Sequence, residues 1–545
     1  MDKESPSFTR RDFLSQAGNS LTASVLMRAA LATGIIQTSV GCGSSSNANP
    51  VINPPNDNPD GNSGNRNGTA RPSDWPANVG SGTRVIILGA GIAGMCAAYE
   101  MQKLGYEVTI LEATERAGGR CRTIRSGDVV VESDSEQVCT FDNNPHLYFN
   151  PGPARIPHHH DLILGYCREF GVALEPFINE NTAAYFHAMQ AFQGRPQIAK
   201  QVIADVRGYI SEMLGQAINS GSLPSGLNAA EQADWLALLQ NYGGLDANYG
   251  YSGSSRAGFP GQTEADSCQR GTLLDPLDLG ELLNSDFWQS QLNFTQSLDQ
   301  QTSMLQPVGG MDNIARAFEA RVGESIIYQA EVNAISKTTN GVSVSFIDSD
   351  NVQQVIESDF CLCTIPATVL RSITTDFSPQ HQSAINSFAY AQSGKVAFQS
   401  PRFWEVENSI YGGISWTNQP ITQIWYPSHG LGQTHGILVG AYTFNNADSL
   451  ILRNLSPQAR ADWAIQEGSQ IHPQLSTQTA SSISVSWPKI PFQLGAWGAS
   501  SPGVLTSADG NILFAGEHLS QLQGWQEGAV LSSYNAIDQI VAMSV

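Results

Sequence analysis

Residues 83–112 combine two short apolar runs with a glycine-rich turn and a helical stretch between them. Gly89, Gly91 and Gly94 form a G-x-G-x-x-G motif directly after the first apolar run. The first glycine permits a tight turn, the second lets a pyrophosphate approach the backbone, and the third lets the helix pack closely on the strand. Glu112 follows the second run, about 20 residues after the motif, where a carboxylate binds ribose hydroxyls. This order predicts a Rossmann-like dinucleotide-binding unit.

A second glycine pair bears on which dinucleotide is bound. In LEATERAGGRCRT, Gly118 and Gly119 lie between Arg116 and Arg120. Alone, this segment has two interpretations. It resembles the extension of FAD-dependent amine oxidases, or it is a surface turn that carries two arginines. A segment near the C-terminus, GNILFAGEHLSQLQGWQEGAVLSSYNAIDQIV, favours FAD. It predicts a buried strand, a glycine turn and a helix whose positive end faces the charge of a reduced flavin. Since the two segments are far apart in the chain, the predicted FAD domain is discontinuous.

The N-terminus has the pattern of an export signal. Arg10 and Arg11 precede a mostly apolar stretch at 21–40, which resembles a twin-arginine signal; a chance arginine pair is the alternative. Cys42 resembles the cleavage site of a lipoprotein, but Ser39 stands where leucine is usual, so lipidation of Cys42 is left open. We therefore expect an exported protein, periplasmic or extracellular, either free or tethered by a lipid anchor.

Charge and composition argue against several function classes. The 28 basic and 49 acidic residues give a net charge of −21, which argues against nucleic acid as a partner. Eight cysteines are too few for a disulfide scaffold in 545 residues, and no C-x-x-C pair supports a structural zinc site. His158, His159 and His160 are expected to begin a helix, because neighbouring residues rarely point to one metal centre. No metal is predicted.

Together these motifs resemble the flavin amine oxidase superfamily and, within it, the secreted FAD-dependent L-amino acid oxidases. The resemblance covers residues 83–545 and is thin between about 190 and 300. It implies an α/β fold (α+β overall) with a discontinuous Rossmann-like FAD-binding domain, a mixed-sheet substrate domain and a helical insert. The expected division is a signal at 1–42, a disordered linker at 43–82, FAD-binding parts at 83–135, 301–370 and 505–545, substrate-domain parts at 136–190 and 371–504, and the helical insert at 191–300.

The resemblance makes FAD the expected cofactor and assigns its contacts to four parts of the chain. These contacts are Gly89, Gly91, Ile92, Ala93, Gly94, Glu112 and Ala113 in the first unit, Gly119, Arg120, Gly152, Pro153, Ala154 and Arg155 after it, Val332 in a later strand, and Gly516, Glu517, Gly524, Trp525, Gln526, Glu527, Gly528 and Ala529 near the C-terminus.

Four matches carry the likeness to L-amino acid oxidases. Arg155, in FNPGPARIPHHH, matches the arginine that grips the substrate carboxylate through two charge-assisted bonds; a structural ion pair is the alternative. Tyr426 matches a tyrosine that binds the same carboxylate, with a core tyrosine as the alternative. Gly524 and Trp525 match a pair that presents a carbonyl to the amine and an aromatic wall. Lys395 matches a lysine that holds a water near flavin N5.

The implied reaction is oxidative deamination of an L-amino acid to a 2-oxo acid. Ammonium and hydrogen peroxide are released, and the Cα hydrogen passes as a hydride to flavin N5. The expected partners are the amino acid and O2, and a homodimer is left open. Two other enzymes compete: a polyamine or aryl-amine oxidase, whose cationic substrate Arg155 would repel, and an amino-acid dehydrogenase that uses a quinone acceptor.

Two features near the expected site leave questions for the structure. Vertebrate members of the family carry an active-site histidine in the helical insert, whereas this chain has no histidine between His187 and His381. One of the three consecutive histidines is expected near the pocket, because the run follows Arg155 closely. Trp497 either lines the pocket or packs in the core.

Overall fold

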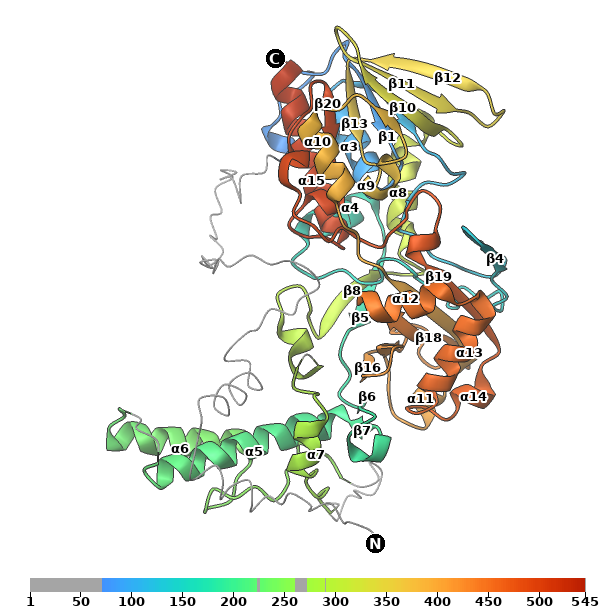
Figure 1. The fold of residues 1–545 in the computed structure, drawn as a ribbon. Coiled ribbons are helices and arrows are strands. Elements are labelled where there is room, and N and C mark those ends of the chain that lie inside the picture. Colours follow the sequence, from blue (N-terminus) through green and yellow to red (C-terminus); the bar gives the residue numbers. More distant parts are fainter. Residues whose placement is uncertain (1–70, 223–225, 260–271, 290, 545) are drawn as a thin grey trace.

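The computed structural model describes residues 71–222, 226–259, 272–289 and 291–544. Figure 1 shows an upper part that contains β1 and α15, a lower part that contains β18 and β19, and a helical arm formed by α5 and α6. The export signal and most of the linker expected from the sequence lie outside the described residues. Within the described ranges, no helix has the length and apolarity needed to span a membrane.

The upper part is built on a five-stranded parallel sheet of order β20-β13-β1-β2-β9. These strands are β1 (Arg84–Leu88), β2 (Glu107–Leu111), β9 (Ile326–Ile327), β13 (Phe360–Cys363) and β20 (Ile512–Phe514). Each strand is a short apolar run, as parallel sheets covered on both faces require. Because the strands come from distant stretches of the chain, the structure confirms the discontinuous Rossmann-like domain.

Alternate residues of β1 face two different apolar layers. Val85 and Ile87 pack against the helices α3 (Ile92–Lys103), α4 (Asp161–Phe170), α8 (Asp312–Val322) and α15 (Gln526–Ser544). Ile86 and Leu88 pack under a second sheet of order β12-β11-β10-β14, with bounds β10 (Glu331–Lys337), β11 (Val342–Ile347), β12 (Gln353–Ser358) and β14 (Thr374–Thr375). The short α9 (Ala367–Leu370) and α10 (Pro379–Ser387) join this second layer.

The lower part is built on a seven-stranded sheet of order β19-β15-β18-β17-β16-β6-β7. Its strands are β6 (Tyr185–His187), β7 (Gln197–Ile198), β15 (Gly394–Pro401), β16 (Ile414–Thr417), β17 (Gln423–Trp425), β18 (His435–Thr443) and β19 (Ser481–Ser486). Most pairs are antiparallel and β16 with β6 is parallel, which confirms a mixed-sheet domain. Its helices are α11 (Phe403–Val406), α12 (Asn446–Asn454), α13 (Pro457–Gly468) and α14 (Leu475–Gln478).

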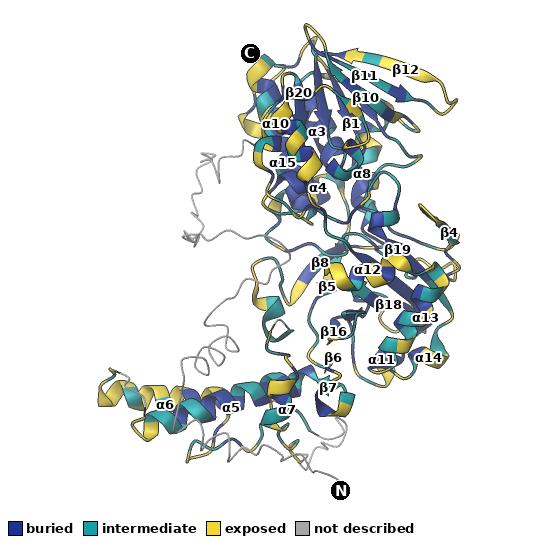
Figure 2. Ribbon diagram, in the orientation of Figure 1, coloured by how far each residue is buried: buried dark blue, intermediate teal, exposed yellow. Residues whose placement is uncertain are grey.

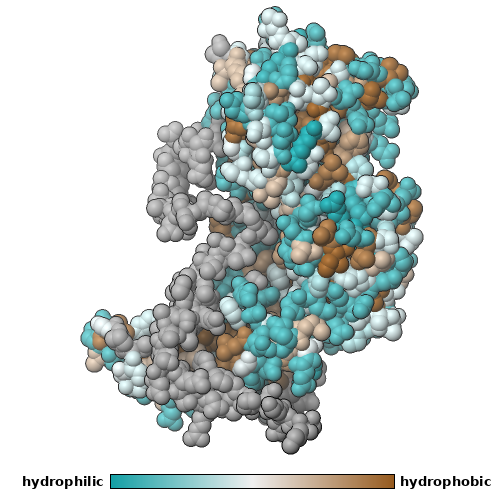
Figure 3. Space-filling model, viewed as in Figure 1, coloured by the Kyte–Doolittle hydropathy of each residue, from teal (hydrophilic) through white to brown (hydrophobic). Residues whose placement is uncertain are grey.

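The helical insert consists of α5 (Ala199–Asn219), α6 (Ala229–Gly243) and α7 (Leu279–Asn284). Figure 2 shows α5 largely buried or half-buried and α6 exposed along much of its length. Two ribbons complete the fold, one of β3 (Val129–Glu132) with β4 (Ser135–Val138) and one of β5 (Leu174–Ile178) with β8 (Ser303–Pro307). Hydrophilic side chains cover most of the described surface visible in Figure 3, interrupted by small apolar patches, as the acidic composition suggests.

Three expected boundaries differ from the structure. Residues 71–82 were assigned to the linker, but Trp75 is buried, its ring meets Tyr534 edge-on at 5.5 Å, and its indole N–H donates to Asp538. The helix α4 was assigned to the substrate domain, yet it packs with α3 and α15. The substrate part expected from residue 371 begins later, since β14 and α10 belong to the FAD-binding domain. In each case tertiary packing, which local sequence does not encode, decides the boundary.

Candidate active site

A cavity of about 450 Å³ lies over the carboxyl ends of β1 and β2, where dinucleotides bind in such sheets. Gly89 has a φ of 103°, which only glycine adopts readily, and turns the chain from β1 into α3. A Cβ on Gly94 would lie 2.0 Å from the Gly89 carbonyl oxygen, so the third glycine of the motif permits the close contact of helix and turn. This geometry fits the backbone cradle that a pyrophosphate requires.

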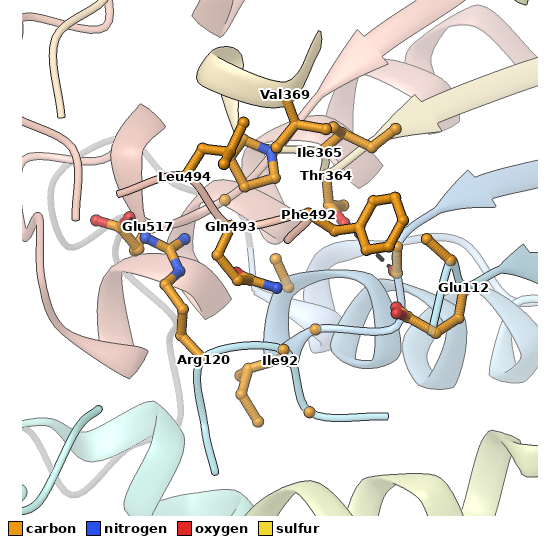
Figure 4. Close-up of a pocket in the computed structure, with 18 of the residues that line it drawn as sticks. Ile92, Glu112, Arg120, Thr364, Ile365, Val369, Phe492, Gln493, Leu494 and Glu517 are labelled. Atoms are coloured by element: carbon orange, nitrogen blue, oxygen red, sulfur yellow. Dashed lines mark hydrogen bonds and ion pairs between the residues drawn. The ribbon is translucent and has the colours of Figure 1, made fainter. Parts of the chain in front are cut away.

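Glu112 lies at the end of β2 and borders the cavity. Its carboxylate accepts the Ala90 N–H at 2.8 Å and both the N–H and the hydroxyl of Thr114 at 3.0 and 2.7 Å. These bonds hold the side chain in place, as a ribose ligand requires. At the opposite side of the cavity, Arg120 pairs with Glu517 at 2.7 Å (Figure 4). Glu517 also accepts the Gly524 N–H at 2.9 Å, so this pair organises the segment that precedes α15.

Most of the FAD contacts expected from the sequence line this one cavity. The set comprises Gly89, Gly91, Ile92, Ala93, Glu112, Ala113, Gly119, Arg120, Pro153, Val332, Gly516, Glu517, Gly524, Trp525, Gln526 and Ala529. Further lining residues were not anticipated from the sequence: Thr364, Ile365, Phe492, Gln493 and Leu494 (Figure 4). Phe492 and Leu494 have positive φ angles of 62° and 45°, a strained backbone typical of ligand-binding loops.

Several expected FAD contacts do not line the cavity. The Glu527 carboxylate instead accepts the N–H groups of Leu162 and Ile163 at 3.1 and 2.9 Å and so caps α4. Burial raises the pKa of Glu527 to about 7. The glycines Gly94, Gly152 and Gly528 serve close packing, since a Cβ on each would lie within 2.3 Å of a backbone oxygen. Ala154 and Arg155 lie beside the cavity, in an aromatic cluster of the substrate domain.

Arg155 is surrounded by aromatic rings from three parts of the chain. Its guanidinium carbon lies 4.4 Å from the centre of the Trp425 ring and 6.0 Å from the centres of the Phe294 and Trp525 rings. Its Nη2 donates to the Gln300 amide oxygen at 3.0 Å. Trp525 also borders the FAD cavity, so Arg155 and the cavity share a wall. A guanidinium in an apolar setting is well placed to bind a planar anion.

The structure places the Tyr426 hydroxyl away from Arg155, contrary to the role expected for it. This hydroxyl bonds to Ser415 Oγ at 2.6 Å and to His472 Nε2 at 2.5 Å, and the side chain belongs to a separate core cluster. Tyr426 directly follows Trp425 at the end of β17, and successive side chains of a strand face opposite sides of the sheet. Since Trp425 faces Arg155, Tyr426 faces the other side.

Tyr442 on β18 lies on the side of the sheet where Tyr426 was expected. It belongs to the same cluster as Trp425 and Trp525, and its ring centre lies 5.1 Å from that of Trp425. It pairs across strands with Lys395, whose Nζ lies 4.7 Å from the Tyr442 ring centre. The sequence offered no signal for this placement, because the register between β15 and β18 is set by the fold.

Lys395 is buried, with 3 % of the residue exposed, on the face of the sheet that also carries Trp425. Its Nζ donates to the carbonyls of Asn150 and Gly152 at 3.1 and 2.8 Å. Burial lowers the pKa of Lys395 to about 7, and the nearby Arg155 charge adds to the effect. The side chain can therefore exchange a proton near neutral pH.

The histidine run and Trp497 also take definite places. The helix α4 begins at Asp161 and not at His158, and His160 occupies its N-cap position. The His160 ring meets the Trp525 ring edge-on at 5.1 Å, so one histidine of the run does reach the wall of the site. Trp497 packs under Gly524, 3.5 Å from the position of a Cβ there, and does not border the FAD cavity.

A parallel sheet with a glycine turn, an acid after its second strand and a helix aimed at the cavity define a dinucleotide-binding oxidoreductase. The model of the flavin containing amine oxidoreductase family matches residues 92–541, and the chain belongs to this family. It is an enzyme, and FAD is its cofactor, since the cavity has the features that a dinucleotide requires.

Two relatives of the chain are named as amino-acid oxidases, and one solved structure shares its fold. A protein of Bacillus subtilis (strain 168) with the provisional name L-amino-acid oxidase YobN is 28 % identical over 477 residues, which cover 82 % of this chain and 92 % of that protein. The flavin-dependent L-tryptophan oxidase RebO of Lentzea aerocolonigenes is 27 % identical over 500 residues, 84 % and 98 % of the two chains. Cyclohexylamine oxidase from Brevibacterium oxydans IH-35A superposes with a TM-score of 0.56 at 15 % identity, covering 85 % and 99 %, and shows the fold alone.

Proposed function

We propose that the chain is an FAD-dependent L-amino acid oxidase, which converts an L-amino acid to a 2-oxo acid and releases ammonium and hydrogen peroxide. The observation that carries this proposal is the guanidinium of Arg155, held among Trp425, Phe294 and Trp525 beside the FAD cavity. An amine oxidase has no use for a cation there, because a protonated amine would be repelled. The names of the two sequence relatives support the same assignment.

A substrate carboxylate is a better partner for Arg155 than the Gln300 amide oxygen. The Gln300 amide oxygen is neutral and accepts one bond from Nη2. A carboxylate accepts two parallel bonds from the guanidinium fork, and each is charge-assisted. The aromatic surroundings strengthen these bonds by excluding water. We expect the substrate to displace Gln300 and to place its Cα toward the FAD cavity, which shares the Trp525 wall.

Tyr442 takes the second carboxylate-binding role in this proposal, in place of Tyr426. It lies in the aromatic cluster of Arg155, opposite Lys395 on the neighbouring strand. Gly524, with a φ of 83° and its N–H bonded to Glu517, precedes Trp525 and orients the amine through its carbonyl. The chemistry that bound FAD would supply is acceptance of the hydride and transfer of electrons to O2. Lys395, with its lowered pKa, holds a proton or a water near that step.

Pairs of substrates that differ only in the carboxylate test this proposal. Peroxide release is measured for L-phenylalanine against phenethylamine and for L-tryptophan against tryptamine. We expect turnover of the amino acids and little of the amines. Turnover of the amines alone would overturn the proposal, and substrate oxidation without peroxide would indicate another electron acceptor. The variant Arg155→Met should lower kcat/KM for the amino acids by about 30- to 1000-fold, which corresponds to about 2–4 kcal/mol.

Two tyrosine variants separate the carboxylate site from the core. Tyr442→Phe should raise the KM for amino acids by about 10- to 150-fold, which corresponds to about 1.5–3 kcal/mol for one hydrogen bond to a charged group. Tyr426→Phe is the matched control: it removes a hydroxyl bonded to Ser415 and His472 and should lower stability while leaving KM close to that of the wild type. The opposite result would restore Tyr426 to the site.

We also propose that the enzyme is exported through the twin-arginine route. Arg10 and Arg11 before an apolar stretch support this, and a chain that folds around a cofactor before export suits that route. Replacing both arginines by lysine should leave active enzyme in the cytoplasm of the producing bacterium. Unchanged export of the double variant would refute the route. Radiolabelled palmitate incorporation, lost in Cys42→Ser, would decide whether a lipid anchor is present.

A further inference from the structure

His159, His160 and Asp299 form a compact cluster of metal-ligating side chains beside the site described above. His159 Nε2 lies 3.2 Å from Asp299 Oδ1, and His160 Nε2 lies 3.9 Å from the same oxygen. One ligand atom from each residue lies within 4.8 Å of the others. In the part of the chain that the structure describes, no other group of three His, Cys, Asp or Glu side chains meets this condition.

His160 gives an independent reason to expect a ligand. Only 1 % of the residue is exposed, and its Nε2 has no hydrogen-bond partner among the described residues. Leaving a buried polar atom without a partner costs free energy, so such atoms mark places where something else binds. Asp299 Oδ1, at 3.9 Å, is too distant for a hydrogen bond.

The spacing of these atoms suits a shared ion. Ligands of a tetrahedral Zn²⁺ at about 2.0–2.1 Å lie roughly 3.3 Å from one another. The separation of His159 Nε2 and Asp299 Oδ1 is already close to this value, and that of His160 Nε2 exceeds it by an amount that a side-chain rotation can close. Two imidazoles and one carboxylate are a donor set that zinc-type cations prefer.

We propose that His159, His160 and Asp299 bind one divalent transition-metal cation of the Zn²⁺ type, with a fourth position open to water. Adjacent histidines rarely point to one centre, but here the Nε2 atoms of both rings lie within 3.9 Å of Asp299 Oδ1 at the N-terminus of α4. The cluster joins two segments that are distant in the sequence. Gln301 strengthens this junction through a contact of 3.4 Å between its amide nitrogen and His159 Nδ1.

The cation site is connected to the active site through neighbouring residues. Asp299 precedes Gln300, whose amide oxygen accepts a hydrogen bond from Arg155, and the His160 ring contacts the Trp525 ring. A bound cation holds Gln300 on the guanidinium and so opposes a carboxylate that must displace it. This consequence rests on the proposed function, and it predicts that Zn²⁺ raises the KM for amino acids. The binding of the cation itself does not depend on that function.

Zinc titration of the FAD-loaded full chain tests the site. The protein is purified without a polyhistidine tag, treated with a chelator and dialysed, and ZnCl₂ binding is measured by calorimetry. We expect one Zn²⁺ per chain, with affinity at least tenfold weaker in His159→Asn and in Asp299→Asn. His158→Asn is the matched control, because this exposed histidine of the same run lies outside the cluster and should bind zinc like the wild type.

A second measurement keeps the site distinct from adventitious surface binding. Co²⁺ in a tetrahedral nitrogen and oxygen site absorbs at wavelengths longer than oxidised flavin, so its bands should appear in the wild type and in His158→Asn and be absent from Asp299→Asn. Zinc affinity that is equal in all variants, or lost in His158→Asn, would overturn the site. Zinc binding with an unchanged KM would overturn the coupling to Arg155, and a chain that binds zinc but oxidises no amino acid would refute only the proposed function.

Discussion

Replacing Lys395 by methionine should change the pH dependence of stability, because this lysine is held in an environment that disfavours its charge. Burial lowers the pKa of Lys395 from 10.5 to about 7. The difference corresponds to about 5 kcal/mol of free energy at about 1.4 kcal/mol per tenfold change. With 3 % of the residue exposed, solvent screens little of this cost.

The sign of the effect follows from where each state holds the proton. In the unfolded chain the lysine keeps its ordinary pKa, so between about pH 7 and pH 10.5 the unfolded state binds more protons and the stability of the folded state rises with pH. The cost of keeping Lys395 is about 5 kcal/mol at pH 6 and about 2 kcal/mol at pH 9. Lys395→Met removes this cost, so its stability relative to the wild type should be about 3 kcal/mol higher at pH 6 than at pH 9.

Comparing the stability at two pH values separates the effect of the Lys395 charge from the effect of the other interactions that the substitution removes. The variant also leaves the carbonyls of Asn150 and Gly152 without their donor, and that penalty does not change with pH. At about 2.1 cal/mol/K per residue, 3 kcal/mol corresponds to about 2–3 °C in Tm. Tm is followed by FAD fluorescence at pH 6 and pH 9, with Lys200→Met, a partly exposed lysine of α5, as the control. If the Tm difference between Lys395→Met and the wild type is the same at both pH values, the reasoning is refuted.

Three further substitutions test the fold around the site. Gly94→Ala places a Cβ 2.0 Å from the Gly89 carbonyl oxygen and should lower the flavin content of the purified protein, measured by absorbance; a full flavin content would contradict the close-packing argument. Arg460→Met leaves Glu132 buried without its ion pair and should cost about 3–5 kcal/mol of stability in denaturant unfolding, a loss that a simultaneous Glu132→Met should reduce. Trp75→Ala should cost about 3–5 kcal/mol in the same assay, whereas a disordered linker would give no change.

The FAD-binding geometry could be predicted from the sequence because it depends on backbone conformations and close backbone contacts that require glycine. A glycine at a φ of 103° or at a helix contact of 2.0 Å cannot be another residue, so Gly89 and Gly94 mark their places in the sequence itself. The strand, the turn and Glu112 lie close to these glycines in the sequence, so a short stretch of the chain is enough to predict them. Glu527 shows the limit: its place beside the helix start suggested a flavin contact, but the direction of its side chain is set by α4, which is more than 350 residues away in the chain.

The substrate side depends on which face of a strand a residue occupies, and a motif match does not contain that information. Trp425 and Tyr426 are neighbours in the sequence, yet one contacts Arg155 and the other bonds to His472 in a separate core. An error of one position in a strand moves a side chain to the opposite face. The register between β15 and β18 removes this ambiguity, because the residue opposite Lys395 must share its face. Tyr442 is that residue, so strand pairing identifies the tyrosine that shares the aromatic cluster of Trp425, which the short motif did not.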